Sequence, residues 1–219
     1  MIGILDYGVG NLRSVEKAFE HIGCEAVVSA DISVLEKADG LVLPGVGAFE
    51  DGIKKLKEKK FDEFIKNWVA AGNPILGICL GMQLLFEYSF ETNCNIVSAD
   101  GGDAVAKGLG IIPGGVKKFE SDEMKIPQMG WNEINIRPDS SLFKGIENKS
   151  YMYFVHSYYC CPEDEAYVAT WTDYIVNYCS SVEMGNVFAT QFHPEKSGRV
   201  GLQILKNFAD LSRVGGGAC

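Results

Sequence analysis

The stretch Gly77–Gln83, which reads Gly-Ile-Cys-Leu-Gly-Met-Gln, constrains the fold of this chain more than any other. It overlaps a short apolar run, Ile75–Ile78, that predicts a buried parallel strand, and a helical pattern follows at Leu84–Phe86. A strand, a sharp turn with Cys79 at its tip and a helix form a nucleophile elbow, with cysteine in place of serine. There the helix N-terminus favours the thiolate, and the backbone N–H after the cysteine can stabilise an oxyanion.

The first ninety residues alternate between strand and helix patterns. The predicted strands are Ile2–Leu5, Ala26–Val28, Leu41–Leu43 and Ile75–Ile78, and the predicted helices are Asn11–His21, with Asn11 as N-cap, and Asp51–Ala70. Such alternation is typical of an α/β fold with a mostly parallel central sheet and helices on both faces.

From about residue 97 the pattern changes to short β-like runs separated by glycine-rich turns. These runs are Val116–Phe119, Glu133–Ile136, Tyr153–Val155, Ala166–Thr170 and Val187–Thr190. We expect mixed or antiparallel strands here, closed by a helix after Pro194 whose apolar residues recur at helical spacing. No repeat or linker interrupts the sequence, so we predict one domain over residues 1–213 and a disordered tail at 214–219.

Composition excludes several classes of function. The chain has 219 residues, 47% of them hydrophobic, and a net charge of -9, so it can bury a full core but lacks the basic surface of a nucleic-acid-binding protein. The lysine-rich stretch Lys54–Lys60 is balanced by acidic neighbours and predicts a solvated helix face. No apolar run has transmembrane length, and Met1–Asp6 predicts a first strand rather than a signal peptide, so we expect no membrane association.

The seven cysteines are odd in number and irregular in spacing, with neither a Cys-x-x-Cys pair nor a zinc pattern. Cys160 and Cys161 are adjacent, which is a poor geometry for a disulfide. We therefore expect reduced cysteines in a cytoplasmic protein that needs no metal and no cofactor.

Three histidines could serve Cys79 as a base. His21 lies near the end of the first predicted helix, where it complements the helix dipole and precedes a glycine cap. His193 follows a predicted strand and precedes Glu195, whose carboxylate can fix the tautomer of the imidazole. His156 also follows a strand but has no acid within three residues. We predict His193 as the base and Glu195 as its orienting carboxylate, with a hydrogen-bonded structural role for His156.

Two glycine-rich loops follow predicted strands. Pro44–Gly47 can aim backbone N–H groups at the elbow and supply a second oxyanion donor beside the N–H of Leu80, although a plain tight turn is equally compatible. Tyr7–Arg13 opens a helix as a dinucleotide-binding fingerprint does, but Arg13 stands where the third glycine would be. A contact with a partner is therefore favoured for this loop over a nucleotide site.

The pattern Gly-x-Cys-x-Gly-x-Gln at 77–83, followed much later by His-Pro-Glu at 193–195, resembles the class I (triad) glutamine amidotransferases. Within them, the chain resembles more closely the glutaminase subunits of imidazole glycerol phosphate synthases. That similarity is carried by the segments Asp6–Leu12, Pro44–Gly47, Gln128–Asn132, Tyr153–Tyr158 and Gln191–Ser197. The segments span nearly the whole chain, and the resemblance implies a flavodoxin-like fold.

The resemblance implies hydrolysis of L-glutamine to glutamate and ammonia. Cys79 would attack the side-chain amide to form a glutamyl thioester, and His193, held by Glu195, would protonate the leaving ammonia. The N–H groups of Gly47 and Leu80 would form the oxyanion hole. The implied substrate contacts are Gln83, Glu91 and the backbone of Ser157 and Tyr158.

The implied partner is a cyclase subunit, a (βα)8 barrel that uses the ammonia to make imidazole glycerol phosphate for histidine synthesis. The residues predicted to face it are Asn11, Trp131, Tyr153 and Lys196. Asn11 and Lys196 are placed at the same sheet edge as Cys79, and Trp and Tyr are frequent interface anchors. Core packing is the alternative for Trp131.

Three alternatives stay open: a glutaminase for another acceptor synthase, another cysteine-elbow α/β hydrolase or peptidase, and a non-catalytic binding module. Gln83 and the His-Pro-Glu pair argue against the hydrolase, and an intact set of Cys79, His193 and Glu195 argues against the binding module. The stretch Cys94–Ala106 departs from the family pattern.

Overall fold

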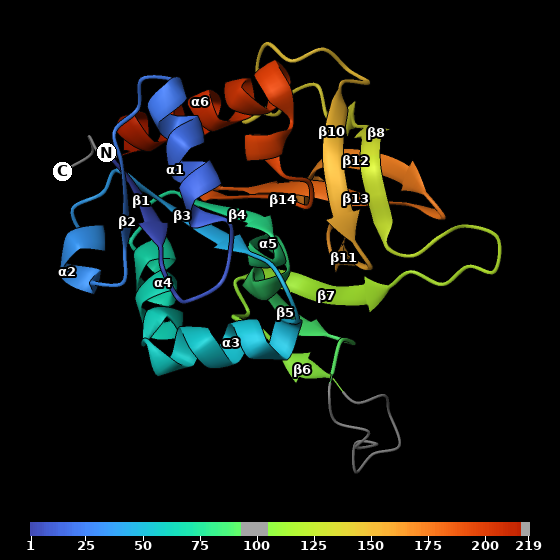
Figure 1. Ribbon diagram of the computed structural model, residues 1–219, viewed down its shortest axis with the longest axis horizontal. Helices are drawn as coiled ribbons and strands as arrows, with labels where there is room; N and C mark the ends of the chain where they lie inside the picture. The colour runs from blue at the N-terminus through green and yellow to red at the C-terminus, as the bar shows by residue number, and fades with distance from the viewer. Residues whose placement is uncertain (93–104, 216–219) are drawn as a thin grey trace.

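The computed structural model describes residues 1–92 and 105–215, and a mixed β-sheet runs through the molecule (Figure 1). One half of the sheet is parallel and has the strand order β2-β1-β3-β4-β14. Its strands are β1 (Ile2–Leu5), β2 (Ala26–Ser29), β3 (Gly40–Gly45), β4 (Ile75–Cys79) and β14 (Val187–Thr190). Apart from the edge strand β2, these strands are buried along their whole length, because both faces of the sheet are covered.

The other half of the sheet starts antiparallel to β14 and continues in the order β13-β11-β7-β5-β6, with β12 and β9 attached beside β13. Its strands are β5 (Phe86–Ser89), β6 (Ala106–Lys107), β7 (Ile112–Lys118), β9 (Asn135–Ile136), β11 (Tyr158–Pro162), β12 (Val168–Tyr174) and β13 (Val176–Met184). Strands β8 (Gln128–Glu133) and β10 (Tyr151–His156) form a separate antiparallel pair. The predicted change from a parallel to a mixed sheet is confirmed.

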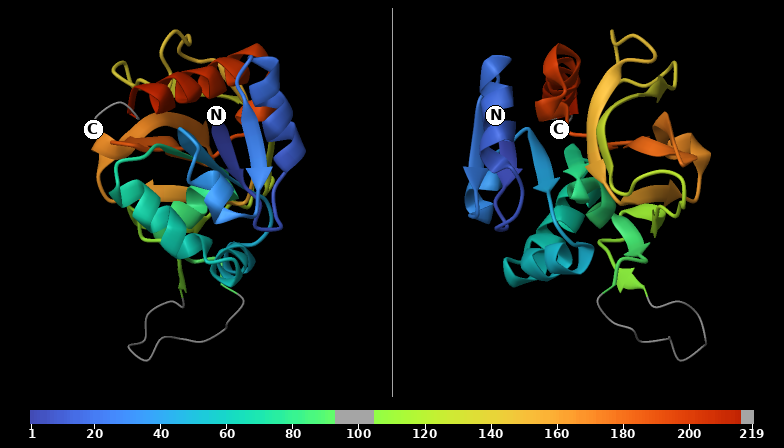
Figure 2. Two further views of the ribbon diagram at one scale, coloured as in Figure 1. Left: turned by 90° about the vertical axis from the view of Figure 1, so that its left-hand side faces the viewer. Right: turned by 45° about the vertical axis from the view of Figure 1, so that its right-hand side comes forward.

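Helices cover both faces of the parallel half (Figure 2). Helices α1 (Leu12–His21) and α6 (Gly198–Gly215) lie on one face, where Phe19 and Phe208 belong to one buried apolar cluster. Helices α3 (Phe49–Glu58), α4 (Phe61–Ala70) and α5 (Leu80–Leu85) lie on the other and belong to a second cluster. The short elements are α2 (Ile32–Leu35) and the 3-10 turns η1 (Glu165–Tyr167) and η2 (Pro194–Lys196).

The predicted helix Asp51–Ala70 is wrong as a single element. It is two helices, α3 and α4, and Lys60 between them has φ 58°, in the left-handed region. The turn ends the first helix, and α4 begins as a separate helix at Phe61, which is fully buried. No glycine or proline marks this break, so apolar periodicity alone could not locate it.

Several other boundaries differ from the predicted ones. The helix after the elbow ends at Leu85, and Phe86 already belongs to β5. The predicted run Glu133–Ile136 is divided between β8 and β9. Asn11 occupies the N-cap of α1, but its side chain makes no capping hydrogen bond. Helix α6 continues to Gly215, two residues past the expected boundary, and residues 216–219 of the expected tail lie outside the described residues.

Over residues 1–92 and 105–215, no helix is long and apolar enough to cross a membrane. Within the same ranges, no three His, Cys, Asp or Glu side chains gather as they would around a metal ion.

Candidate active site

Cys79 lies at the junction of β4 and α5, in the sharp turn that the sequence predicts. Its backbone has φ 55° and ψ -111°, a strained conformation of the kind that costs on the order of 1–3 kcal/mol. A Cβ atom on Gly81 would lie 1.8 Å from the carbonyl oxygen of Leu43, and one on Gly77 would lie 2.9 Å from the carbonyl carbon of Gly81. The two glycines are therefore a steric requirement of the elbow that exposes Cys79 to a pocket.

His193 follows β14, which pairs in parallel with β4, so both strands deliver a side chain to the same pocket. Its Nδ1 lies 2.9 Å from Oε1 of Glu195, and these side chains are 3% and 1% exposed. Burial lowers the pKa of His193, but Cys79 and then Glu195 outweigh it by hydrogen bonding and charge and raise the pKa to about 9. Because Glu195 engages Nδ1, Nε2 is the ring nitrogen left for Cys79. Among the described residues, Nε2 makes no hydrogen bond to a nitrogen or oxygen atom.

Strand β10 is tied to the turn that carries this histidine. The N–H of His193 donates to the carbonyl of Tyr153 at 3.0 Å. The N–H of Tyr153 donates to Oγ of Ser197 at 3.0 Å, and that hydroxyl donates to the carbonyl of His193 at 2.7 Å. The backbone of the candidate base is therefore fixed to β10 at two points.

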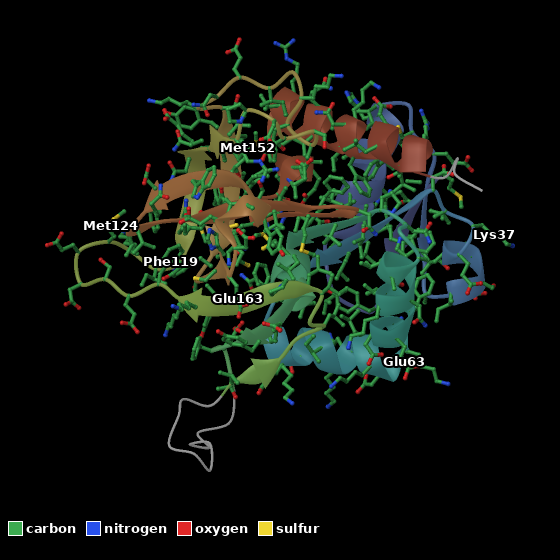
Figure 3. The ribbon with its side chains drawn as sticks, turned by 180° about the vertical axis from the view of Figure 1, so that it is seen from behind. Lys37, Glu63, Phe119, Met124, Met152 and Glu163 are labelled. Atoms are coloured by element: carbon green, nitrogen blue, oxygen red, sulfur yellow. The ribbon has the colours of Figure 1, made fainter. Side chains whose placement is uncertain are left out.

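His156 lines the same pocket but is held as a structural group. Its Nδ1 lies 2.7 Å from the carbonyl of Tyr158 and its Nε2 lies 3.2 Å from the hydroxyl of Tyr178. The ring also packs beside Phe119, which Figure 3 labels, with 5.4 Å between ring centroids. Burial lowers the pKa of His156 to about 4, so the ring is neutral near pH 7. The expected structural role of His156 fits these contacts.

The loop after β3 lies beside the nucleophile because Gly45 pairs with Cys79 in the parallel register of β3 and β4. The following residues, Val46 and Gly47, line the pocket, and Gly47 has φ 95°. Leu80, the first residue of α5, lines it as well. The two segments predicted to supply oxyanion donors are therefore neighbours on either side of the cysteine.

The pocket has a volume of about 370 Å³ and brings together the predicted substrate contacts. Gln83, Glu91, Ser157 and Tyr158 all line it with Cys79 and His193. The carboxylate of Glu91 accepts the N–H of Phe49, the first residue of α3, at 3.1 Å. Burial raises the pKa of Glu91, with the backbone hydrogen bond opposing the shift.

This geometry combines a cysteine at a strained elbow, a buried histidine–carboxylate pair and a polar pocket. The model of the family "Glutamine amidotransferase class-I" matches residues 3–211. The chain belongs to the class-I glutamine amidotransferases.

Two similar proteins of known name are subunits of the same kind of enzyme. It is 47% identical over 212 residues to imidazole glycerol phosphate synthase subunit HisH of Chlorobaculum tepidum, covering 96% of this chain and 100% of the relative. It is 49% identical to the subunit of the same name from Syntrophotalea carbinolica, again covering 96% and 100%.

Solved structures agree on the fold at much lower identity. A structure described as PurLQS from Thermotoga maritima matches with TM-score 0.73 and 21% identity, over 96% of this chain and 97% of that one. Another, described as a glutamine amidotransferase, matches with TM-score 0.71 and 18% identity, over 97% and 98%. The amidotransferase fold is therefore shared well beyond the similar sequences.

Sequence reasoning missed one residue of this amidotransferase site. Gln191 is fully buried, and its Nε2 donates to the sulfur of Cys79 at 3.8 Å. It stands two residues before His193, the spacing that places side chains on the same side of an extended chain. That spacing was the available signal.

Three of the four predicted interface residues of the amidotransferase, Trp131, Tyr153 and Lys196, lie near one another. Trp131 of β8 and Tyr153 of β10 are paired in register, with ring centroids 6.0 Å apart, and Nζ of Lys196 lies 5.9 Å from the centre of the Tyr153 ring. Asn11 is exposed at the start of α1. Trp131 is 56% exposed, so the alternative of core packing is wrong.

Proposed function

We propose that this chain is the glutaminase subunit of an imidazole glycerol phosphate synthase, acting in histidine biosynthesis. The observation that carries the proposal is the single pocket in which Cys79, His193 and the groups suited to hold glutamine come together. The 46–49% identity to HisH subunits over nearly the whole chain supports this acceptor over others. The solved structure described as a putative GMP synthase subunit is 20% identical and PurLQS is 21% identical, so both support the fold alone.

The first chemical step is attack on the carboxamide of glutamine. The Cys79 thiolate forms a bond to the carboxamide carbon, and the N–H groups of Gly47 and Leu80 stabilise the oxyanion. His193, whose raised pKa favours the protonated ring, donates the proton that lets ammonia leave. The product of this half-reaction is a glutamyl thioester.

The second half-reaction reverses the role of the histidine. His193, now neutral, takes a proton from water, and the resulting hydroxide attacks the thioester. The Cys79 thiolate leaves and glutamate is released. Glu195 holds Nδ1 throughout, which keeps Nε2 directed at the reacting atoms and stabilises the imidazolium.

The remaining pocket residues suit an amino acid. The Glu91 carboxylate can pair with the α-ammonium group of glutamine, and the backbone at Ser157 and Tyr158 can receive the α-carboxylate. Gln83 projects into the same pocket from α5.

The partner is a cyclase subunit, and we propose that it is a (βα)8 barrel. It docks on the surface defined by Asn11, Trp131, Tyr153 and Lys196, next to the mouth of the glutamine pocket. The exposed ring of Trp131, the half-buried ring of Tyr153 and the exposed Lys196 suit an interface with apolar anchors and an acidic partner group. Docking there shields ammonia from water on its way from Cys79 to the cyclase.

The test is a glutaminase assay of the purified chain, alone and with the cyclase and its nucleotide substrate. We expect slow release of glutamate from the chain alone, because the peptide between Val46 and Gly47 can hold the oxyanion donor turned away until the partner binds. Cys79→Ser should abolish glutamine hydrolysis yet leave synthesis from added ammonium intact. Near-normal glutaminase activity of that variant would exclude Cys79 as nucleophile.

A further inference from the structure

Gln191 connects the candidate nucleophile to a candidate substrate residue. Its side chain is fully buried directly after the last residue of β14, and that of Gln83 is 5% exposed on α5. Nε2 of Gln83 lies 3.1 Å from Oε1 of Gln191, and Nε2 of Gln191 lies 3.8 Å from the sulfur of Cys79. The cysteine therefore stands at one end of a chain of two buried amides.

A backbone carbonyl fixes the orientation of both amides. Nε2 of Gln83 also donates, at 3.1 Å, to the carbonyl of Tyr158, a group that can only accept. The nitrogen of Gln83 must therefore face both Tyr158 and Gln191, so Gln191 presents its oxygen to Gln83. Its NH2 group is then left to face Cys79. The hydrogen-bond network therefore determines that the NH2 group of Gln191, and not its oxygen, faces the sulfur of Cys79.

We propose that Gln191 holds an N–H donor on the sulfur of Cys79 and thereby favours the thiolate. This inference rests on the proposed function, since it assigns Gln191 a place in the same reaction. A thiolate accepts such a hydrogen bond more strongly than a neutral thiol does, because the acceptor is charged. The bond also fixes the direction of the sulfur at the strained elbow.

The amide of Gln191 differs from His193 in that it neither gains nor loses a proton during the reaction. His193 gives its proton to the departing amide nitrogen, which leaves as ammonia, in the first half-reaction and takes another proton from water in the second. Gln191 keeps its donor in both, so it can stabilise the sulfur when the thiolate attacks and again when the thiolate leaves. Gln83 and the carbonyl of Tyr158 hold that donor in place.

The experiment measures the rate of Cys79 alkylation by iodoacetamide against pH in the free full-length chain, with the modified site located by peptide fragmentation. Gln191→Met removes the donor at similar volume. Gln191→Glu keeps an oxygen for Gln83 but places a carboxylate oxygen at the sulfur. Thr190→Val is the matched control, since Thr190 is the buried last residue of β14, directly before Gln191, and its hydroxyl donates to the carbonyl of Phe192.

We expect the midpoint of the alkylation profile to rise by about one pH unit in Gln191→Met, the size of a hydrogen bond to a charged group. It should rise further in Gln191→Glu and stay in place in Thr190→Val. Unchanged midpoints in both Gln191 variants, with native circular dichroism, would overturn the proposal. So would an equal shift in Thr190→Val, which would point to general loosening of the strand.

The measurement needs no glutamine, cyclase or nucleotide, so its outcome is independent of the acceptor reaction. Loss of hydrolysis in Cys79→Ser tests the proposed function separately. A second reading comes from turnover in the complete complex: loss of the donor should lower kcat by more than it raises KM, because the sulfur and not the substrate loses a partner.

Discussion

Two histidines line one pocket, and their surroundings give them opposite acid–base properties. The ring of His193 has a carboxylate at Nδ1 and the sulfur of Cys79 nearby, and its pKa rises to about 9. The ring of His156 meets a carbonyl and a hydroxyl among aromatic rings, and burial lowers its pKa to about 4. Burial alone would lower both, so charged partners decide which histidine can hold a proton at neutral pH.

At the residue scale, we predict that replacing His193 and replacing His156 will lower turnover by different amounts. His193→Asn should lower glutaminase kcat in the assembled enzyme by about 10²–10⁴-fold, the usual loss for a missing general acid–base group. His156→Asn should lower it far less, because neither ring nitrogen of His156 is free for proton transfer. Steady-state kinetics of both variants provide the check, and a greater loss in His156→Asn would reverse the assignment.

The pKa of His156 also predicts how stability depends on pH. The unfolded chain protonates this histidine near pH 6.5, whereas the folded chain resists protonation until about pH 4. Folding is therefore penalised progressively as pH falls from about 6.5 to 4, by about 3 kcal/mol in total. Urea unfolding at several pH values should show a shallower acid loss for His156→Asn than for the unsubstituted chain. Parallel curves would contradict the assignment.

At the scale of elements, the break between α3 and α4 places a side chain in the left-handed region. Lys60 has φ 58° and is exposed, and its N–H donates to the carbonyl of Lys57 at 3.0 Å. Only glycine adopts this conformation without steric strain. The break nevertheless aligns four buried side chains of α4 with the core, namely Phe61, Phe64, Ile65 and Trp68.

We predict that Lys60→Gly stabilises the chain by about 0.5–1 kcal/mol, because relief of the strained backbone exceeds the added freedom of the unfolded chain. The matched control is Lys57→Gly, an exposed lysine in α3, which should destabilise by a similar amount. Free energies of unfolding from urea titration test the pair. Destabilisation by both substitutions would show that the turn carries no strain.

Strands β1 to β4 of the parallel half could be predicted because they are short apolar runs that alternate with helices, whereas β14 was expected among the mixed or antiparallel strands and pairs in parallel with β4. Strands β11 and β13 were not predicted. Strand β13 has no continuous apolar run, because it buries Ser180 and Ser181, whose hydroxyls hydrogen-bond to the hydroxyl of Thr170 at 2.8 Å. Buried polar pairs of this kind conceal a strand from any hydrophobic pattern. The elbow, the candidate base and its carboxylate carry local motifs, whereas the contacts of Gln191 are with Gln83 and Cys79, more than a hundred residues away, and its spacing from His193 indicates only that both side chains lie on one side of the chain.

At the scale of the whole molecule, the candidate catalytic residues and the proposed docking surface lie close together, because the N–H of His193 donates to the carbonyl of Tyr153. Cys79 is the last residue of β4, and His193 and Lys196 follow the neighbouring parallel strand β14, while Trp131 and Tyr153 come from the separate β8–β10 pair. The exposed Trp131 and the half-buried Tyr153 therefore lie on the strand pair that contacts the buried candidate base, His193. Such a layout suits an enzyme whose product passes directly to a partner.

We predict that Lys196→Glu weakens the coupling between the two activities of the complex, because it reverses the charge at the docking surface. Stimulation of glutaminase by the cyclase should fall and ammonia leakage should rise, while the melting temperature changes little. Lys206→Glu on α6 carries the same charge reversal and should leave coupling unchanged. Equal coupling in the two variants would place Lys196 off the interface.

The hydrogen bond from the His193 amide to the Tyr153 carbonyl gives the complex a built-in reporter. The donor belongs to the candidate base, and the acceptor belongs to a residue on the proposed docking surface. Any partner that steadies β10 must slow the opening of this bond, and hence the exchange of that one amide proton with deuterium. Deuterium uptake at the peptide containing His193 therefore reads out docking at the reaction centre, before any glutamine is consumed.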